Sequence, residues 1–224
     1  MIPECLSYAE GPEEDKAHRS TEQVRIYETP RGKLLLARHC SPALVERLRA
    51  DDGLRAFARR PEREHQLLLS IARQPQSLLT LAYTLSGEIV GQVTLAPAGR
   101  RWREMSDIGE VAIEVSSGWR RRGIAHQLLR YAFDLHDIER KIIIGLGLTW
   151  HWDFEEAGLS RFQYRAMIER LFAAYGFVEY VTSEANIRMD PANIFLARLG
   201  SQIRQEEMTR FFQCLLQSEE LPGL

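Results

Sequence analysis

Cysteine is scarce in this sequence, with three residues among 224, at positions 5, 40 and 214. They form no Cys-x-x-Cys pair and no set of paired spacings, which argues against a disulfide framework. The chain also lacks an apolar run as long as a membrane span. Its first 20 residues lack the basic start and apolar stretch of a signal peptide. Isolated cysteines without a signal peptide predict a reducing, cytoplasmic location.

An excess of positive charge is missing as well. The 29 Lys and Arg residues are balanced by 31 Asp and Glu residues, for a net charge of −2. This balance excludes a protein that is basic overall and binds nucleic acid through its whole surface, so any basic patch must be local. Apolar residues make up 45% and charged residues 27% of the chain, as in ordinary soluble globular domains.

The pattern of elements predicts one domain of the α+β (mixed α/β) class. Residues 1–22 are polar and acidic, and we expect a flexible N-terminal arm there, followed by a single domain over 23–224 that ends in a helical extension. Short β-rich runs alternate with helical periodicity. Strands are expected at 33–38, 77–84, 89–97, 108–115, 141–148 and 177–182, and helices at 41–50, from 61, 124–135, 158–175, 190–200 and up to about 216.

Local signals support several of these elements. Ser41 followed by Pro42 is typical of a helix start. The helix from residue 61 is expected to bury Leu67, Leu68 and Ile71 on one face. Asp190-Pro191 and Gly200 bracket a segment that we interpret as a helix, and the two β-rich runs around residues 85–88 predict a hairpin.

The segment 108–115, IGEVAIEV, alternates in a way that predicts a half-buried strand. Val111, Ile113 and Val115 share one face, and Glu110, Ala112 and Glu114 share the other. The strand therefore carries two carboxylates on one side, close to its end.

The stretch that follows, SSGWRRRGIAHQLL (116–129), runs from the strand through a tight loop into an amphipathic helix. A helix start presents free backbone N–H groups and the positive end of the helix dipole, and it binds phosphate readily. The loop has no GxxxxGK[ST] or GxGxxG pattern, which disfavours nucleoside triphosphates and dinucleotides. The alternatives are a solvated arginine turn and, less favoured, a nucleic-acid contact.

Arg120, Gly123 and Ala125 form an Arg-x-x-Gly-x-Ala pattern that resembles the signature of the GCN5-related N-acetyltransferases (GNAT). The order of hairpin, strand, helix, strand, helix and AAYGF also matches that family. The resemblance implies a mostly antiparallel mixed sheet with a splayed parallel strand pair. It also implies that loop amides hold the pyrophosphate of acetyl-CoA. The expected acetyl-CoA contacts are Val115, Arg120, Arg121, Arg122, Gly123, Ile124, Ala125 and His126.

Motifs in the second half resemble the acetoin-utilisation acetyltransferase (AcuA) family more closely. They are WHWD (150–153), YRAMIERL (164–171) and DPANIFLARLG (190–200), and the resemblance covers roughly residues 33 to 216. It implies a protein N-lysine acetyltransferase that acetylates AMP-forming acetyl-CoA synthetase and switches it off. The implied partner is therefore acetyl-CoA synthetase.

Acetyl transfer to an amine needs a general base. We expect Glu114 to be the catalytic base and Glu110 to be the second candidate; the alternative is that both carboxylates are solvated positions on an exposed sheet face. Many members of the GNAT family carry a tyrosine that protonates the leaving thiolate, but Phe172 stands at that position here. Tyr164 and Tyr175 lie near it in sequence at a different spacing, so the general acid stays open.

Other residues have weaker functional interpretations. His151 and Asp153 are close in sequence, but no partner with metal-ligand spacing accompanies them, and we expect no metal. The neighbouring tryptophans favour a protein interface, and Asn193 favours a capping role. Two other functions fit the same fold: acetylation of a small amine, and inhibition of a partner by a non-catalytic acyl-CoA sensor.

Overall fold

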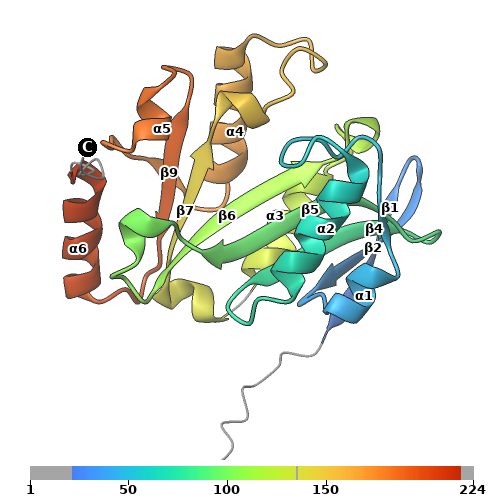
Figure 1. The fold of residues 1–224 in the computed structure, drawn as a ribbon, viewed down its shortest axis with the longest axis horizontal. Coiled ribbons are helices and arrows are strands. Elements are labelled where there is room, and N and C mark those ends of the chain that lie inside the picture. Colours follow the sequence, from blue (N-terminus) through green and yellow to red (C-terminus); the bar gives the residue numbers. More distant parts are fainter. Residues whose placement is uncertain (1–21, 135, 218–224) are drawn as a thin grey trace, which may run out of the picture.

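The fold is built on one sheet. The structure is a computed structural model, and it describes residues 22–134 and 136–217. The strands of this part of the chain lie in the order β1-β2-β4-β5-β6-β7-β9-β8, and the short β3 pairs with β5 (Figure 1). The strands are β1 (Gln23–Thr29), β2 (Gly32–Arg38), β3 (Arg49–Ala50), β4 (Leu78–Thr84), β5 (Glu88–Pro97), β6 (Ile108–Val115), β7 (Ile142–Gly147), β8 (Val178–Glu179) and β9 (Ile194–Leu199). The helices are α1 (Pro42–Glu46), α2 (Pro61–Ala72), α3 (Ile124–Phe133), α4 (Arg161–Ala173), α5 (Ala185–Arg188) and α6 (Gln205–Leu216).

Neighbouring strands are antiparallel except at two places. β6 is parallel to β7, and β3 is parallel to β5. The predicted mixed, mostly antiparallel sheet with a parallel strand pair is confirmed. No helix of the described residues is both long and apolar enough to cross a membrane.

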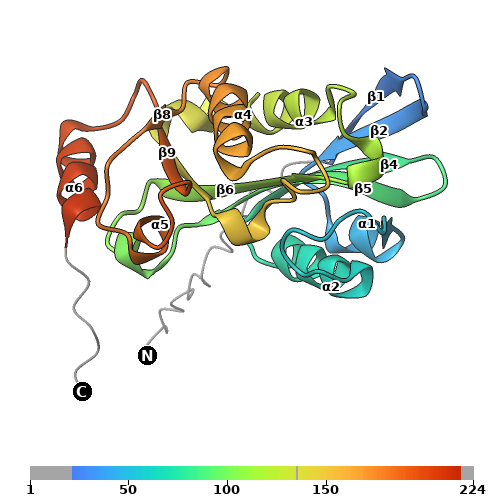
Figure 2. The ribbon, with the colours of Figure 1, turned by 90° about the horizontal axis from the view of Figure 1, so that it is seen from above.

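Helices cover the two faces of the sheet in separate layers. α1 and α2 lie on one face, and α3 and α4 lie on the other (Figure 2). Leu68 of α2 packs in a cluster with Leu79 and Leu81 of β4. Leu128 of α3 packs in a second cluster with Val93 of β5. Burial of each leucine side chain contributes about 1.5–3 kcal/mol, so these two clusters hold the layers together.

The local signals of the first half are confirmed with small changes. The Ser41 side chain accepts a hydrogen bond from the N–H of Leu44, as a helix cap does. The helix that follows ends at Glu46 rather than near residue 50, because Arg49–Ala50 pairs with β5. The hairpin β4–β5 and the strand 108–115 are as predicted.

The predicted apolar face of the second helix is wrong in part. Leu68 is buried, but Leu67 is 38% exposed. The buried face of α2 instead carries Glu64, a charged residue that periodicity of apolar residues does not detect. Leu135, the last residue of the helix predicted over 124–135, and all but the last residue of the predicted arm 1–22 lie outside the described residues.

The helix predicted within 190–200 is wrong, because Ile194–Leu199 forms β9. This strand pairs with β7 on one edge and β8 on the other. Its alternate residues are buried in two different clusters, Ile194 and Leu196 in one and Phe195 and Ala197 in the other. Asp190 accepts a hydrogen bond from the N–H of Ala192 and closes a turn instead of starting a helix. The strand predicted at 177–182 is limited to Val178–Glu179.

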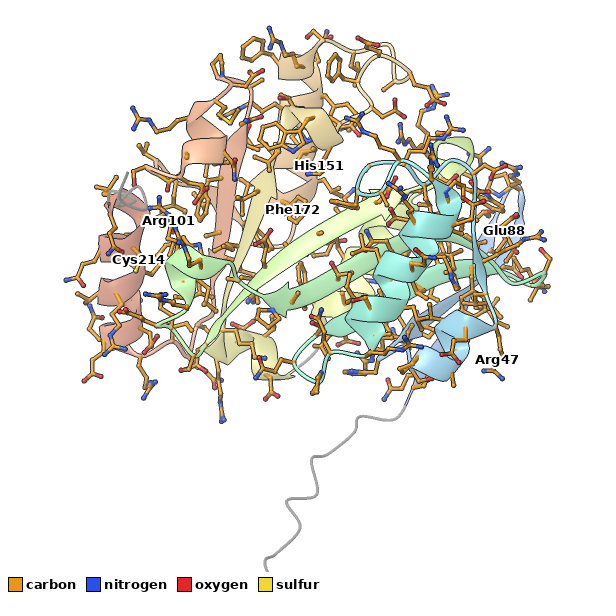
Figure 3. The ribbon with its side chains drawn as sticks, viewed as in Figure 1. Arg47, Glu88, Arg101, His151, Phe172 and Cys214 are labelled. Carbon is orange, nitrogen blue, oxygen red and sulfur yellow. The ribbon has the colours of Figure 1, made fainter. Side chains whose placement is uncertain are left out.

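α6 is attached to the far end of the sheet by a buried aromatic and charged cluster. The ring of Trp102 stacks on Phe211 of α6 at 5.4 Å between centroids. The side chain of Arg101, 4% exposed, pairs with Glu184 at 3.1 Å and donates to the backbone oxygen of Cys214 at 2.8 Å. Arg101 and Cys214 lie together beside α6 (Figure 3). Arg101 and Trp102 therefore anchor α6 to the segment between β5 and β6.

Candidate active site

β6 and β7 are paired only over their first residues, and we call the stretch where their backbones are no longer paired the β6–β7 gap. Their pairing ends at Glu110 and Ile144, although β6 continues to Val115 and stays paired with β5 (Figure 1). The N–H of Ser116 donates to the oxygen of Val90 on β5. Because N–H groups alternate in direction along a strand, the N–H of Val115 points the other way, toward the gap.

The loop between β6 and α3 presents a run of free backbone donors. None of the six N–H groups from Arg121 to His126 donates a hydrogen bond to the described residues. Gly123 precedes the helix with a positive φ of 74°, and no side chain caps the helix start. Together with the positive end of the α3 dipole, these groups form a site suited to a phosphate anion.

The β1–β2 hairpin supports this loop from behind. The hydroxyl of Tyr27 donates to the backbone oxygen of Arg122 at 2.8 Å. A Cβ on Gly123 would lie 2.9 Å from that hydroxyl, so both the positive φ and the close contact require glycine here. The guanidinium of Arg31 lies over the ring of Trp119 at 4.6 Å and fixes the preceding turn.

The three arginines of the loop point in different directions. Arg120 donates to the oxygen of Val115 at 3.2 Å and pairs with Asp153 at 2.9 Å. Arg122 donates to the oxygen of Arg120 at 2.8 Å. The exposed side chain of Arg121 makes no hydrogen bond or ion pair with the described residues. The arginines are therefore mostly internal supports of the loop, and its free donors are in the backbone.

His126 lies in the first turn of α3 and contacts the end of the α4 region. Its Nδ1 lies 3.3 Å from the hydroxyl of Tyr175. That hydroxyl also lies 2.6 Å from the backbone oxygen of His126, to which it donates. Tyr175 therefore holds the first turn of α3 in place.

Glu114 is buried near the end of β6 and is not a solvated surface position. The residue is 5% exposed. Its Oε1 accepts hydrogen bonds from the N–H of Arg55 at 2.6 Å and the N–H of Ala56 at 2.8 Å, whereas its Oε2 has no hydrogen-bond partner. Burial raises the pKa of this carboxyl, although the two N–H donors and Arg120 oppose the shift.

Glu110 lies at the point where β6 and β7 part. It is half-buried, and its pKa is raised by burial and by the nearby Glu184. At the rise of a strand it is about 13 Å from Glu114, so the two carboxylates sit at separate places on one face.

The segment before α2 covers Glu114, and nothing in the sequence pattern signals this. Ser116 donates to Asp51, and the N–H of Ser117 donates to the oxygen of Gly53 at 3.3 Å. These contacts fix the segment 51–60 over the end of β6. Such long-range pairing of loop backbone with a strand end leaves no local periodicity to detect.

Glu64 of α2 is a second buried carboxyl in the same region, and sequence reasoning missed it. It is completely buried; Oε2 accepts the N–H of Ala58 at 3.1 Å, and Oε1 has no hydrogen-bond partner. Burial, followed by the charge of Glu114, raises the pKa of Glu64 to about 7.

Of the aromatic residues considered for a general acid, Tyr164 lies nearest this region. Phe172 is buried and packs edge-on against Phe177 at 5.0 Å, so it belongs to the core. Tyr164 stacks on Trp152 at 5.4 Å. Its pKa is raised by burial first, and the charges of Arg120, Asp153 and Glu114 also act on it. A raised pKa keeps the phenol protonated near neutral pH.

The WHWD segment contributes contacts to the same region. The Nδ1 of His151, which is labelled in Figure 3, lies 2.7 Å from the backbone oxygen of Ala56, in the segment over Glu114. Trp150 is 42% exposed. Within residues 22–134 and 136–217, no group of three His, Cys, Asp or Glu side chains is arranged to hold a metal ion. Asn193 accepts the N–H of Thr149 at 2.7 Å and so fixes this segment to the turn before β9.

Comparison with known proteins agrees with this geometry. Residues 43–144 match the sequence model of the acetyltransferase (GNAT) family. The acetoin utilization protein AcuA of Bacillus licheniformis is 31% identical over 199 residues, which cover 87% of this chain and 94% of that protein. AcuA of Bacillus subtilis is 32% identical over the same coverage. The crystal structure of an acetoin utilization protein from Exiguobacterium sibiricum superposes with a TM-score of 0.82 at 28% identity, covering 88% of this chain and 94% of that one.

The splayed strand pair, the loop with free amides and the likeness over nearly the whole length of the AcuA proteins lead to one conclusion. The chain is an acetyltransferase of the GNAT family and belongs to its AcuA branch.

Proposed function

We propose that this protein transfers the acetyl group of acetyl-CoA to a lysine side chain of a partner protein, and that the partner is AMP-forming acetyl-CoA synthetase. The observation that carries the proposal is the run of six free backbone N–H groups beside a strand gap whose edge holds a buried carboxylate. The resemblance to the AcuA family, which implies a protein-lysine acetyltransferase, is our reason to favour a protein substrate over a small amine.

The chain has donors suited to acetyl-CoA. The amides from Arg121 to His126 would hold the pyrophosphate, with Gly123 allowing close approach. The pantetheine arm would enter the gap between β6 and β7, and the N–H of Val115 would bind the thioester oxygen. Arg120 would act by orienting the oxygen of Val115 and the loop, since its guanidinium is already paired with Asp153.

The chemistry requires a neutral amine. Removing a proton from lysine near pH 7 costs about 4.6 kcal/mol, from its reference pKa of about 10.4. Glu114 would take this proton through its free Oε2, directly or through a water molecule. The amine nitrogen then attacks the thioester carbon, the C–S bond breaks, and the nitrogen releases its second proton to solvent water as the amide forms. CoA leaves as a thiolate, and Tyr164 would supply its proton.

The surface around the site supports a protein partner. Trp150 exposes an indole, and the ring of Phe57 lies 5.3 Å from His151 beside it. Aromatic side chains of this kind are enriched at the centre of protein interfaces. Two of the three loop arginines are engaged inside the protein, which disfavours nucleic acid as the ligand. The free thiols of Cys40 and Cys214 favour the cytoplasm.

The test is intact-mass spectrometry of acetyl-CoA synthetase incubated with this protein and acetyl-CoA. One added acetyl group with loss of synthetase activity is expected, and Glu114→Gln is expected to abolish both. Inhibition without a mass change would identify a non-catalytic inhibitor instead. No effect of either kind would refute the proposed substrate and lead to small amines.

A further inference from the structure

Two buried glutamates share one strip of backbone at the edge of the site. The segment Arg55–Ala58 passes between them: the N–H groups of Arg55 and Ala56 bind Glu114, and the N–H of Ala58 binds Glu64. Each carboxyl keeps one oxygen without a hydrogen-bond partner. Buried carboxyl oxygens are normally satisfied, so two unsatisfied ones on carboxyls bound to the same backbone segment require an explanation.

The surroundings of the two carboxyls are unequal. Glu114 has two N–H donors, and it faces Arg120 from the loop, Asp153 from the segment after β7 and Tyr164 from α4. Glu64 has a single N–H donor, and the charged group that acts on it is Glu114. Two like charges in a buried site cannot both form without a large cost, so the pair carries one negative charge below about pH 7. The extra donor and the cation place that charge on Glu114 and the proton on Glu64.

We propose that Glu64 is a positioning residue of the acetyl transfer, which acts through the buried carboxyl pair to set how strongly Glu114 attracts a proton. The proposal rests on the proposed function, because it takes Glu114 as the base. While Glu64 is neutral, Glu114 is a weak base for a lysine proton. When Glu64 also ionises, the second negative charge makes Glu114 a stronger base, and general base catalysis improves as the base comes closer in pKa to the working pH.

The experiment that tests this role compares the acetylation activity of wild type and of Glu64→Gln between pH 6 and pH 8.5. Glutamine keeps the shape of the side chain and an oxygen for the N–H of Ala58, but it cannot ionise. The measured quantity is the ratio of kcat/KM values for acetylation of acetyl-CoA synthetase, in which the ionisation of the substrate lysine cancels. The ratio of wild type to variant is expected to be near one at pH 6 and about three- to tenfold at pH 8.5. Glu62→Gln, at an exposed position in the first turn of the same helix, is the control and is expected to give a ratio near one throughout.

A second measurement is independent of activity. NMR of protein labelled with ¹³C at the glutamate carboxyl should show one group that titrates near pH 7 and is missing in Glu64→Gln. In Glu114→Gln the same group should titrate at lower pH, because the like charge is gone.

The outcomes separate the two hypotheses. A kcat/KM ratio that does not change with pH overturns the role of Glu64, as does the absence of a coupled titration. Full activity of Glu114→Gln would refute the proposed base and with it the route by which Glu64 acts. That failure is recognised separately, because the coupled titration in the NMR spectra would persist.

Discussion

Replacement of Glu64 by glutamine should make the protein more stable at alkaline pH. Glu64 is completely buried, and its pKa in the folded protein is about 7, compared with 4.5 for an ordinary glutamate. Between these values the folded protein keeps a proton that the unfolded chain has released. The stability contributed by this proton is fully present below pH 4.5 and is lost as the pH rises through about 7.

The size of the effect follows from the shift. The difference between a pKa of about 7 and one of 4.5, at about 1.36 kcal/mol per pKa unit, corresponds to about 3 kcal/mol. The free energy of unfolding of Glu64→Gln, relative to wild type, should therefore increase by about 3 kcal/mol between pH 4.5 and pH 8. The absolute difference at one pH also contains the change in packing, and the change with pH does not.

The assay is urea unfolding followed by circular dichroism at pH 4.5, 6, 7 and 8. Relative to the midpoint for Glu64→Gln, the midpoint for wild type should fall steadily from pH 4.5 to about pH 7 and then level off, with the slope of the transition unchanged. Glu62→Gln, exposed on the same helix, controls for a general effect of one fewer acidic residue. A parallel pH dependence of wild type and Glu64→Gln would refute the assignment of a buried proton to Glu64.

Three further changes test other parts of the site. Gly123→Ala, whose Cβ would lie 2.9 Å from the Tyr27 hydroxyl at a φ of 74°, should weaken acetyl-CoA binding at least tenfold by calorimetry. Gly99→Ala, with open space around its Cβ, should bind as wild type does, and equal affinity of the two variants would contradict the close-contact argument. Tyr164→Phe should lower kcat about tenfold or more with little change in KM, and an unchanged kcat would exclude Tyr164 as the acid. Arg101→Met should lower the free energy of unfolding by about 3–5 kcal/mol because it leaves Glu184 and the α6 carbonyls unpaired, and a thermal melt within 2 °C of wild type would refute this.

The loop at the start of α3 could be predicted from sequence because its determinants are local. The strand, Gly123 and the helix follow one another within a few residues, and each has its own pattern. The carboxylate face of β6 was also predictable from alternation. Burial of Glu114 was not, since it depends on N–H groups 58 and 59 residues away in the chain.

Where local signals and long-range pairing disagree, pairing decides. Asp190-Pro191 and Gly200 are typical of helix ends, yet the segment between them is β9, because the free edge of β7 offers backbone partners along its whole length. The burial of Glu64 could not be predicted from local sequence signals either. An acidic residue in the first turn of a helix normally indicates a favourable interaction with the helix dipole, and only the fold shows that this one is buried.

The late position of β9 in the chain has a consequence for biosynthesis. Every residue of β7, from Ile142 to Gly147, pairs with β9, whereas only the first three pair with β6. A growing chain that has not yet released residues 194–199 from the ribosome has an apolar strand with an open edge, and such an edge recruits other chains. One wall of the β6–β7 gap therefore forms only near the end of translation. Premature termination before β9 should yield aggregated protein rather than a shorter enzyme.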